Sequence, residues 1–384
     1  MIEMARFYSS PGKSDKWRRS TVFRTCYLCR SMFGHRRRFV ALLTVGLVFA
    51  AAAESPAAAA RKRRRTTSSK RTTVRRPPAP PTVVLAEGAS PADAAVGEAC
   101  RKGLGSQQGS AVAMDPKTGR VIAVVNPTLG VERAYQPCSV FKIVVGLAGL
   151  SEGVITPRSQ YNCRGGSCWL WPGHGPIDLR RALAVSCNPY FEWVGEQLGY
   201  AKVQHYARLL GLGAPSGLNM QQETSGALPL FVPPSLVGHV SSHAKGVATS
   251  AVQLAVLISA TINGGTVYTP QLAPVAGFVP HPRWRLPDTT VTNGLAEGFL
   301  GAVNEGSAST AFDPDITVAG KTGTCAGVGW LASYAPADDP RIVIVTFVKP
   351  GSGHLASTVA GRIYQYLYKP AAPQIAAPLV SSGE

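Results

Sequence analysis

The chain has 384 residues, in which 39 Lys and Arg side chains outnumber 21 Asp and Glu. Residues 1–86 hold 19 of the basic and 3 of the acidic side chains, which leaves a nearly balanced 20 against 18 in residues 87–384. The basic character therefore belongs to an N-terminal tail. It argues against a nucleic-acid-binding domain and against nucleic acid as a partner.

A basic leader over residues 1–38 precedes an apolar segment over residues 39–53. This segment is about fifteen residues long, short of the ~20 that span a bilayer and typical of the hydrophobic region of a secretory signal. A cleaved signal peptide and a short, tilted membrane anchor both fit. Small residues that follow offer cleavage sites, whereas the basic run 61–65 would slow translocation. We therefore expect an extracytoplasmic domain on a basic stalk.

The stalk is predicted to be a disordered linker over residues 54–86, because it is rich in Arg, Lys, Thr, Ser and Pro and too poor in apolar residues to bury a core. It could contact a membrane surface or a cell-wall polymer, or serve only as a solvated tether. Residues 87–370, about 280 in number, suffice for one large two-lobed domain. A disordered tail is expected over 371–384.

The first polar motif lies at the predicted start of a buried helix. Ser139 precedes the apolar run 141–150, which ends at the breaker residues 151–153. Free backbone amides at a helix start favour negative charge on the serine oxygen. Lys142 follows one turn later on the same face, where an apolar setting would lower the pKa of its amine and suit it to act as a base. A capping serine beside a snorkelling lysine is the alternative.

The second motif interrupts a helical pattern over residues 179–194, near Pro189. Ser186 and Asn188 stand one residue apart on this irregular backbone, so both side chains could face a cleft. There the hydroxyl would relay a proton and the amide would hydrogen-bond a substrate. Capping and turn formation are the alternative roles.

The third motif, Lys-Thr-Gly-Thr over residues 321–324, follows an extended apolar segment over 316–320. Two further strands are predicted near 328–335 and 341–348, joined by a turn rich in Pro and Asp. At a strand edge, the lysine and threonine of the motif would present a cation and a hydroxyl to a carboxylate. Gly323 would let a substrate backbone approach without meeting a side chain.

The motifs Ser-x-x-Lys, Ser-x-Asn and Lys-Thr-Gly, in this order, supply the parts of a serine acyl-enzyme and are the signature of penicillin-binding proteins and class A β-lactamases. The chain resembles the transpeptidase domain of penicillin-binding proteins from about residue 110 to about residue 368. It resembles most the class B, penicillin-binding protein 2-like branch. The flanking features that carry this likeness are the segments 113–123, 173–175, 223–229 and 253–265.

The resemblance implies a penicillin-binding D,D-transpeptidase. Ser139 would attack the D-Ala-D-Ala end of a peptidoglycan stem peptide, with Lys142 as its base. Ser186 would pass a proton to the leaving amine, and Asn188 would bind the substrate peptide. The acyl-enzyme would then react with an amine of a neighbouring peptide to form a crosslink, and β-lactam antibiotics would trap the serine.

The resemblance also implies how the substrate is held. Lys321 and Thr322 would bind its terminal carboxylate, beside Gly323 and Thr324 on the same strand. The backbone amides of Ser139 and Thr324 would form the oxyanion hole. No cofactor is expected, and the implied location is the bacterial cell envelope on its extracytoplasmic, periplasmic side.

Other activities on this scaffold stay open. A D,D-carboxypeptidase would hydrolyse the same acyl-enzyme, and a serine β-lactamase would do so rapidly. Class A β-lactamases carry Glu-x-x-Leu-Asn where this chain has Glu-Thr-Ser-Gly-Ala at 223–227, and class D enzymes usually carry Ser-x-Val in place of Ser-x-Asn. A non-catalytic β-lactam sensor or wall-binding module is a third interpretation, against which Lys142 argues because a binding module needs no base.

The implied fold is α/β and β-lactamase/transpeptidase-like, with a five-stranded antiparallel sheet flanked by helices and an all-helical lobe. A C-terminal helix over 355–368 would cover one face and the lobe, over 136–265, the other. The site would lie where the lobe meets the edge strand. The strands are expected near 110–115, 120–125, 316–325, 328–335 and 341–348.

The cysteines offer two possible disulfide bonds. Cys163 and Cys168 could close a small loop in an oxidising compartment. Cys138 and Cys325 adjoin the first and third motifs, and a bond between them would clamp the serine helix to the third-motif strand; free buried thiols are the alternative. No metal site is predicted, because the one Cys-x-x-Cys pair has no second pair and no two histidines enclose the glutamate of a zinc helix.

Overall fold

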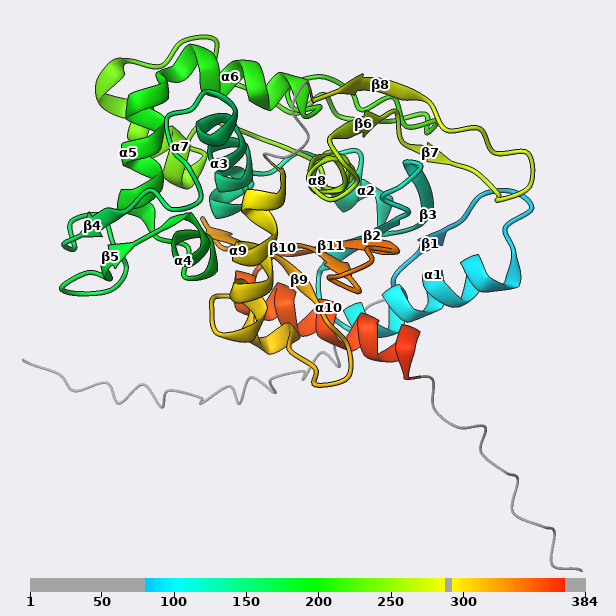
Figure 1. The fold of residues 1–384 in the computed structure, drawn as a ribbon. Helices are drawn as coiled ribbons and strands as arrows, with labels where there is room; N and C mark the ends of the chain where they lie inside the picture. Colours follow the sequence, from blue (N-terminus) through cyan, green and yellow to red (C-terminus); the bar gives the residue numbers. More distant parts are fainter. Residues whose placement is uncertain (1–79, 287–291, 370–384) are drawn as a thin grey trace, which may run out of the picture. The chain divides into compact units, whose positions relative to one another are not determined.

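A central sheet organises the protein, whose computed structural model describes residues 80–286 and 292–369. Its strands run in the order β1-β3-β2-β11-β10-β9, and neighbours along this path are antiparallel (Figure 1). The short β7 (Gln271–Leu272) joins β3 in parallel. The strands of the main path are β1 Val83–Val84, β2 Gly109–Met114, β3 Arg120–Val125, β9 Ala319–Cys325, β10 Val328–Ala335 and β11 Ile342–Val348.

The predicted α/β class and the five predicted strands are confirmed, but the sheet has seven strands rather than five. The two additions, β1 and β7, are two residues long and therefore too short to show a strand pattern. The linker boundary at residue 86 was wrong, because β1 pairs with Val124 and Val125. The predicted segments 1–38, 39–53 and 371–384, and the linker up to residue 79, lie outside the described residues.

Two helices cover one face of the sheet, α1 (Pro91–Leu104) and α10 (Gly353–Tyr368), as Figure 1 shows. α10 begins two residues before its predicted start, because the Ser352 side chain caps it. α1 was not predicted. It packs closely on α10 through Gly103, where an added Cβ would lie 2.3 Å from a side-chain atom of Ile363.

The other face carries the predicted helical lobe (Figure 1). At its centre α8 is buried along its whole length against β2 and β11, so its apolar residues surround the helix instead of forming a stripe. α9 lies beyond the predicted range and packs on α4 and β9. The helices not yet given bounds are α2 Pro127–Gly130, η1 Cys138–Phe141, α3 Lys142–Ser151, α4 Leu179–Ala184, α5 Asn188–Leu198, α6 Tyr200–Leu209, η2 Pro234–Leu236, α7 Val237–His243, α8 Ala251–Ala260, α9 Asn293–Asn304 and η4 Ser309–Ala311. Of these, η4 packs on α10 rather than in the lobe.

Two small hairpins complete the described fold: β4 (Tyr161–Cys163) pairs with β5 (Gly175–Ile177), and β6 (Thr266–Tyr268) pairs with β8 (Pro282–Arg285). β9 ends the order of the main sheet and therefore has a free edge. Among the residues that the structure describes, none of the helices combines the length and the apolar character that crossing a bilayer requires. The free edge of β9 and the helical lobe together position the three motifs.

Candidate active site

Ser139 lies in η1, the 3-10 turn that leads directly into α3. The prediction of a helix start was right in position, although the first turn is 3-10 rather than α. Cys138 has a φ of 54°, so the chain turns sharply just before the serine. Ser139 opens onto a pocket of about 410 Å³, which the lobe and the β9 edge line together. Its lining residues are Ser139, Trp169, Val185, Ser186, Asn188, His243, Ser307, Thr322, Thr324, Ser352, Gly353 and His354.

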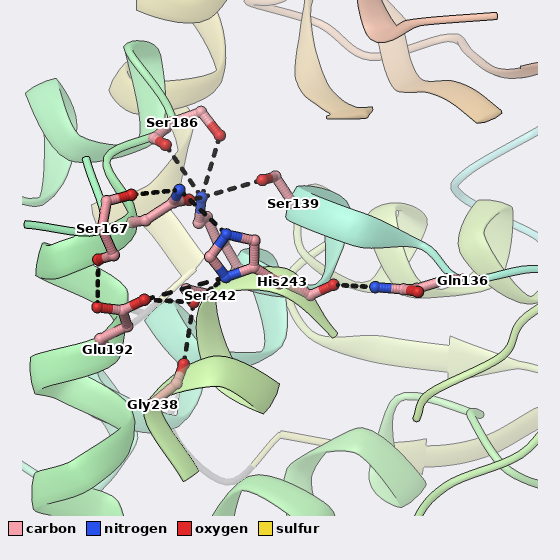
Figure 2. Close-up of polar contacts among 10 residues, drawn as sticks. Gln136, Ser139, Ser167, Ser186, Glu192, Gly238, Ser242 and His243 are labelled. Carbon is pink, nitrogen blue, oxygen red and sulfur yellow. Dashed lines mark hydrogen bonds and ion pairs between the residues drawn. The ribbon is translucent and has the colours of Figure 1, made fainter. Parts of the chain in front are cut away.

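The side chains of Ser139 and Ser186, labelled in Figure 2, both contact one amine, that of Lys142. The Lys142 side chain is fully buried, and Nζ lies 3.0 Å from Ser139 Oγ. It also lies 3.0 Å from the Ser186 carbonyl oxygen, 3.2 Å from Ser186 Oγ and 2.6 Å from Asn188 Oδ1. Burial lowers the pKa of Lys142 to about 7.

These contacts determine what a neutral Lys142 can do. An uncharged amine has two N–H donors and one lone pair, whereas the Ser186 carbonyl and the Asn188 amide oxygen can only accept. Those two acceptors use both N–H groups. The lone pair is left for a hydroxyl proton, and the Ser139 hydroxyl is within reach. The arrangement can therefore deprotonate Ser139.

Ser186 lies between α4 and α5, with a left-handed φ of 57°. The predicted interruption of the helix is thus confirmed, and Pro189 falls in the first turn of α5, where a missing N–H costs nothing. Ser186 Oγ is also 2.9 Å from Lys321 Nζ, so one hydroxyl bridges two buried lysines. Burial first, and the charge of Lys142 second, hold the pKa of Lys321 well below its ordinary value.

β9 places Thr322 and Thr324 on the pocket side, two residues apart. Thr322 Oγ1 is 2.6 Å from the hydroxyl oxygen of Ser307, and Thr324 Oγ1 accepts a hydrogen bond from the Gly353 amide at 2.7 Å. Ser307 was not predicted, because it belongs to no motif and reaches the pocket only through the packing of α9 against β9. These three hydroxyl side chains therefore line the pocket, where an incoming carboxylate could bind.

The structure gives a reason for Gly323 that differs from the predicted one. Gly323 is buried opposite Trp330, and a Cβ added to it would lie 2.4 Å from the Pro137 carbonyl oxygen. The backbone that passes closely over this glycine is that of the protein itself, one residue before η1. Gly323 therefore allows the serine turn to lie directly against β9.

A disulfide bond joins Cys138 to Cys325, which are 187 residues apart in sequence. From the sequence, this bond and a pair of free thiols were both possible. Cys138 directly precedes Ser139, and Cys325 directly follows Thr324. The bond therefore ties together the two segments whose backbone amides were predicted to form the oxyanion hole; that role of the amides stays a prediction.

Cys163 and Cys168 are free thiols, so the other possible disulfide bond is not formed. Instead, their sulfurs lie with Cys187 Sγ and a His174 ring nitrogen, all within 4.8 Å of one another. His174 Nδ1 is 3.2 Å from Cys168 Sγ and 3.6 Å from Cys163 Sγ. Three thiols and an imidazole are the ligand set of a structural zinc site, so this cluster could hold zinc. No metal site was predicted, although the sequence carries a signal for one, a Cys-x4-Cys-x5-His pattern completed by the cysteine of the second motif.

Zinc analysis would test this cluster. Full-length protein purified without chelators is expected to contain about one zinc ion per chain, because a set of three thiolates and one imidazole matches its preferred ligands. Cys168→Ser should lower that content, measured by plasma mass spectrometry. Cys100→Ala removes a buried free thiol in α1, outside the cluster, and should leave it unchanged. Metal-free protein whose thiols are alkylated without a chelator would contradict the assignment.

The fold and the site together define a class of protein. A buried amine that faces a serine hydroxyl, beside a second serine and a Lys-Thr-Gly strand, is the arrangement of a serine acyl-enzyme. The family model for the penicillin binding protein transpeptidase domain matches residues 109–369. The chain therefore belongs to the family of penicillin-binding protein transpeptidase domains.

The similarity of the chain to individual relatives is low, with sequence identities of 29% or less in the three comparisons given next. The chain is 29% identical over 319 residues to stage V sporulation protein D of Bacillus subtilis, covering 69% of this chain and 49% of that protein. It is 24% identical over 357 residues to the peptidoglycan D,D-transpeptidase MrdA of Haemophilus influenzae, covering 71% and 54%. Penicillin-binding protein A of Mycobacterium tuberculosis, solved as an imipenem acyl-enzyme complex, has the same fold with a TM-score of 0.61 and 22% identity, covering 71% of this chain and 75% of that one. The predicted class B, penicillin-binding protein 2-like branch is confirmed, and the chain spans about half the length of the first two relatives.

Proposed function

We propose that this protein is a D,D-transpeptidase, which acylates Ser139 with the D-Ala-D-Ala end of a peptidoglycan stem peptide and then forms a crosslink. The observation that carries the proposal is the buried Lys142 amine, which lies 3.0 Å from Ser139 Oγ and has a pKa lowered to about 7. Such an amine can accept a proton near neutral pH, as a general base must. The relative named peptidoglycan D,D-transpeptidase supports the same activity.

In acylation, an ester bond to Ser139 forms and the amide C–N bond of the substrate breaks. Ser139 Oγ attacks the carbonyl carbon of the penultimate D-alanine while Lys142 takes the hydroxyl proton. The backbone amides of Ser139 and Thr324 stabilise the negative oxygen, a contribution for which one donor is worth ~10²–10³ in rate. Ser186 passes a proton to the leaving nitrogen as the C–N bond breaks and the terminal D-alanine departs. The contacts of Ser186 with both lysines suit it to this relay.

The remaining polar residues hold the substrate and complete the cycle. Lys321 and Thr322 bind the terminal carboxylate, whose charge compensates the buried ammonium. Asn188 hydrogen-bonds the peptide backbone. An amine of a second stem peptide then attacks the acyl carbon, the ester C–O bond breaks, and the amine proton returns to Ser139 Oγ. The product is a new peptide bond between two stems.

A β-lactam antibiotic enters the first half of this cycle. Attack by Ser139 opens the strained ring amide, but the nitrogen stays covalently attached to the acyl group and cannot depart as D-alanine does. The retained fragment then blocks access of the acceptor amine, so we expect a long-lived acyl-enzyme. The solved complex of the Mycobacterium tuberculosis relative with imipenem supports this expectation.

Rapid hydrolysis, as in a β-lactamase, receives no support from the acidic residues. Glu223, the glutamate nearest the class A pattern in sequence, accepts hydrogen bonds from the backbone amides of Ser216 and Gly217 at 2.6 and 3.0 Å. Among the described residues that line the pocket, none carries a carboxylate. A deacylating water would therefore lack a base of the class A kind. A D,D-carboxypeptidase shares every residue of the site and differs only in its acceptor.

The proposed setting is the extracytoplasmic side of the bacterial cell envelope, where stem peptides are crosslinked. The segment over 39–53 would deliver or anchor the domain there, and the basic linker would contact the membrane surface or a cell-wall polymer. The density of basic residues in this linker supports an anionic partner. Stem peptides and β-lactams are the proposed ligands of the domain itself.

Intact-protein mass spectrometry tests the proposal. After exposure to benzylpenicillin, the full chain is expected to gain the mass of one penicillin and to retain it for minutes or longer, whereas Ser139→Ala should gain nothing. Retention distinguishes a penicillin target from a β-lactamase, which would release the opened drug quickly. With a stem-peptide donor and an amine acceptor, the crosslinked product is expected by chromatography. Failure of the Ser139 protein to take up any penicillin would leave only the non-catalytic module.

A further inference from the structure

The side chain of Asn188 is held in one orientation by its neighbours. Its amide oxygen is 2.6 Å from Lys142 Nζ, and its amide nitrogen donates to the Ser167 carbonyl oxygen at 3.1 Å and to His243 Nε2 at 3.2 Å. A carbonyl oxygen can only accept, so the NH2 group must face Ser167. The second hydrogen of that group then points at the His243 ring. His243 Nε2 must be unprotonated to accept it.

A closed ring of hydrogen bonds fixes the tautomer of His243 (Figure 2). His243 Nδ1 is 2.6 Å from Ser242 Oγ, and Ser242 Oγ is 3.1 Å from a carboxylate oxygen of Glu192. The other carboxylate oxygen of Glu192 accepts from the Ser167 hydroxyl, which completes the ring back to Asn188. The Ser242 proton can go to Glu192 or to the Gly238 carbonyl oxygen, and in either case its oxygen is free to accept Nδ1–H. The proton of the neutral imidazole therefore resides on Nδ1.

The backbone of His243 is also tied to the nucleophile. His243 is the last residue of α7, where a helical carbonyl lacks a partner within the helix, and it accepts a hydrogen bond from Gln136 Nε2 at 2.7 Å. Gln136 lies three residues before Ser139, and its own carbonyl oxygen accepts from Trp330 Nε1 on β10 at 2.9 Å. The imidazole therefore has a fixed place relative to the serine turn.

We propose that His243 is a positioning residue, which in its neutral form holds the Asn188 amide so that Oδ1 faces Lys142, and whose protonation removes that support. A protonated ring would point Nε2–H at the Asn188 NH2 group, and two donors cannot bond each other. Turning the amide over would restore that contact only by placing Oδ1 against the Ser167 carbonyl oxygen, which also only accepts, and by aiming the NH2 group at Lys142. In either orientation the amide lacks one of its partners, so Oδ1 is no longer held against Lys142. The inference rests on the proposed roles of Lys142 and Asn188.

The charged neighbours of His243 favour the neutral form. Burial and the nearby Lys142 on α3 lower the pKa of His243, and His239, one turn earlier on α7, acts in the same direction. Glu192 on α5, with its carboxylate 3.9 Å from Nδ1, opposes them but does not outweigh them. The pKa lies below the ordinary value of 6.5, so the ring is neutral at neutral pH and becomes charged only as the solution is acidified. Acid therefore removes the support of Lys142.

The test is the rate constant for labelling of the full chain by a fluorescent penicillin, measured from about pH 5 to about pH 9. In the wild type, the acid decline should reflect two groups, Lys142 and His243. His243→Gln places an uncharged acceptor oxygen near the Nε2 position, so its rate above neutral pH should stay near that of the wild type while its acid decline reflects Lys142 alone. His243→Ala removes the acceptor and should lower the rate at every pH, by about 10-fold.

His239→Gln is the matched control, because it removes a histidine from the same helix that does not contact Asn188. Its acid decline should still reflect two groups, with the His243 step at slightly higher pH because His239 lowers the pKa of His243. Ser139→Ala, run alongside, reports on the proposed function itself. Labelling that does not depend on Ser139 would overturn that function. Two outcomes would overturn the inference about His243 while labelling still depends on Ser139 and the proposed function stands. In one, His243→Gln keeps the wild-type acid decline; in the other, His243→Ala keeps the wild-type rate.

Discussion

Replacing Lys142 with methionine is expected to lower the rate of Ser139 acylation by penicillin about 10³-fold, because the serine then loses the only amine within 3.0 Å of its hydroxyl among the described residues. Methionine keeps most of the volume of the lysine, and it removes a buried polar group whose burial is costly. The thermal midpoint should therefore hold or rise while the rate falls. Stopped-flow labelling and differential scanning fluorimetry measure the two quantities.

The pH dependence of the wild-type acylation rate is an independent test of Lys142 as the base. Lys142 acts as a base only when it is neutral, and its pKa is about 7, so the acylation rate should rise as the pH rises through about 7 and be lost below it. Lys202→Met, which removes an exposed lysine paired with Glu152, should change neither rate nor profile. A Lys142→Met protein that still acylates within a few-fold of the wild-type rate would show that another group serves as the base.

Loss of the Cys138–Cys325 bond is expected to lower the free energy of unfolding by ~2–5 kcal/mol, because the bond closes a loop of 187 residues and so restricts the unfolded chain. Cys138→Ser, Cys325→Ser and the double variant should lose the same amount, since each breaks one shared bond. Chemical denaturation under non-reducing conditions measures the loss. We also expect slower acylation, because the bond holds the serine turn against β9.

Reduction provides the matched control for these variants. A thiol reductant should destabilise the wild type to the level of the double variant and leave the double variant unchanged. Cys100→Ala, which removes a buried free thiol from α1, should respond to the reductant as the wild type does. Equal stability of the wild type with and without reductant, or additive losses in the two single variants, would show that the bond contributes nothing.

The sequence was most informative where chemistry and local pattern coincide. The lysine of Ser-x-x-Lys had to lie one helical turn from its serine, and the Lys-Thr-Gly strand had to be extended and apolar, so both were predictable from neighbours in sequence. The structure brings Ser139, Lys142, Ser186 and Lys321 into one hydrogen-bonded set, as the motifs required. The long strands were predictable for the same reason, because five or more consecutive residues carry their own pattern.

What escaped prediction depends on tertiary packing. α1 approaches α10 closely at a glycine, Gly103, and β1 and β7 acquire strand structure only by pairing with β3. Ser307 enters the pocket beside Thr322 although no motif contains it. His243 contacts Asn188 across 55 residues of sequence, through a ring of side chains that no local pattern encodes. Such contacts arise only when separate elements have already been placed.

Lys142 and Lys321 approach the same Ser186 oxygen at 3.2 and 2.9 Å, and the charge of Lys142 disfavours a proton on Lys321. On its own, the pair therefore carries fewer protons than its two amines could bind. In the role proposed for Lys321, the carboxylate of an arriving ligand would make the missing proton favourable, so that ligand binding would be coupled to proton uptake. Alkaline solution should weaken ligand binding because Lys321 loses its charge, whereas acid solution should stop activation of Ser139 because Lys142 becomes protonated. We therefore expect acylation to depend on the two lysines in opposite senses, with Lys142 required neutral and Lys321 required charged.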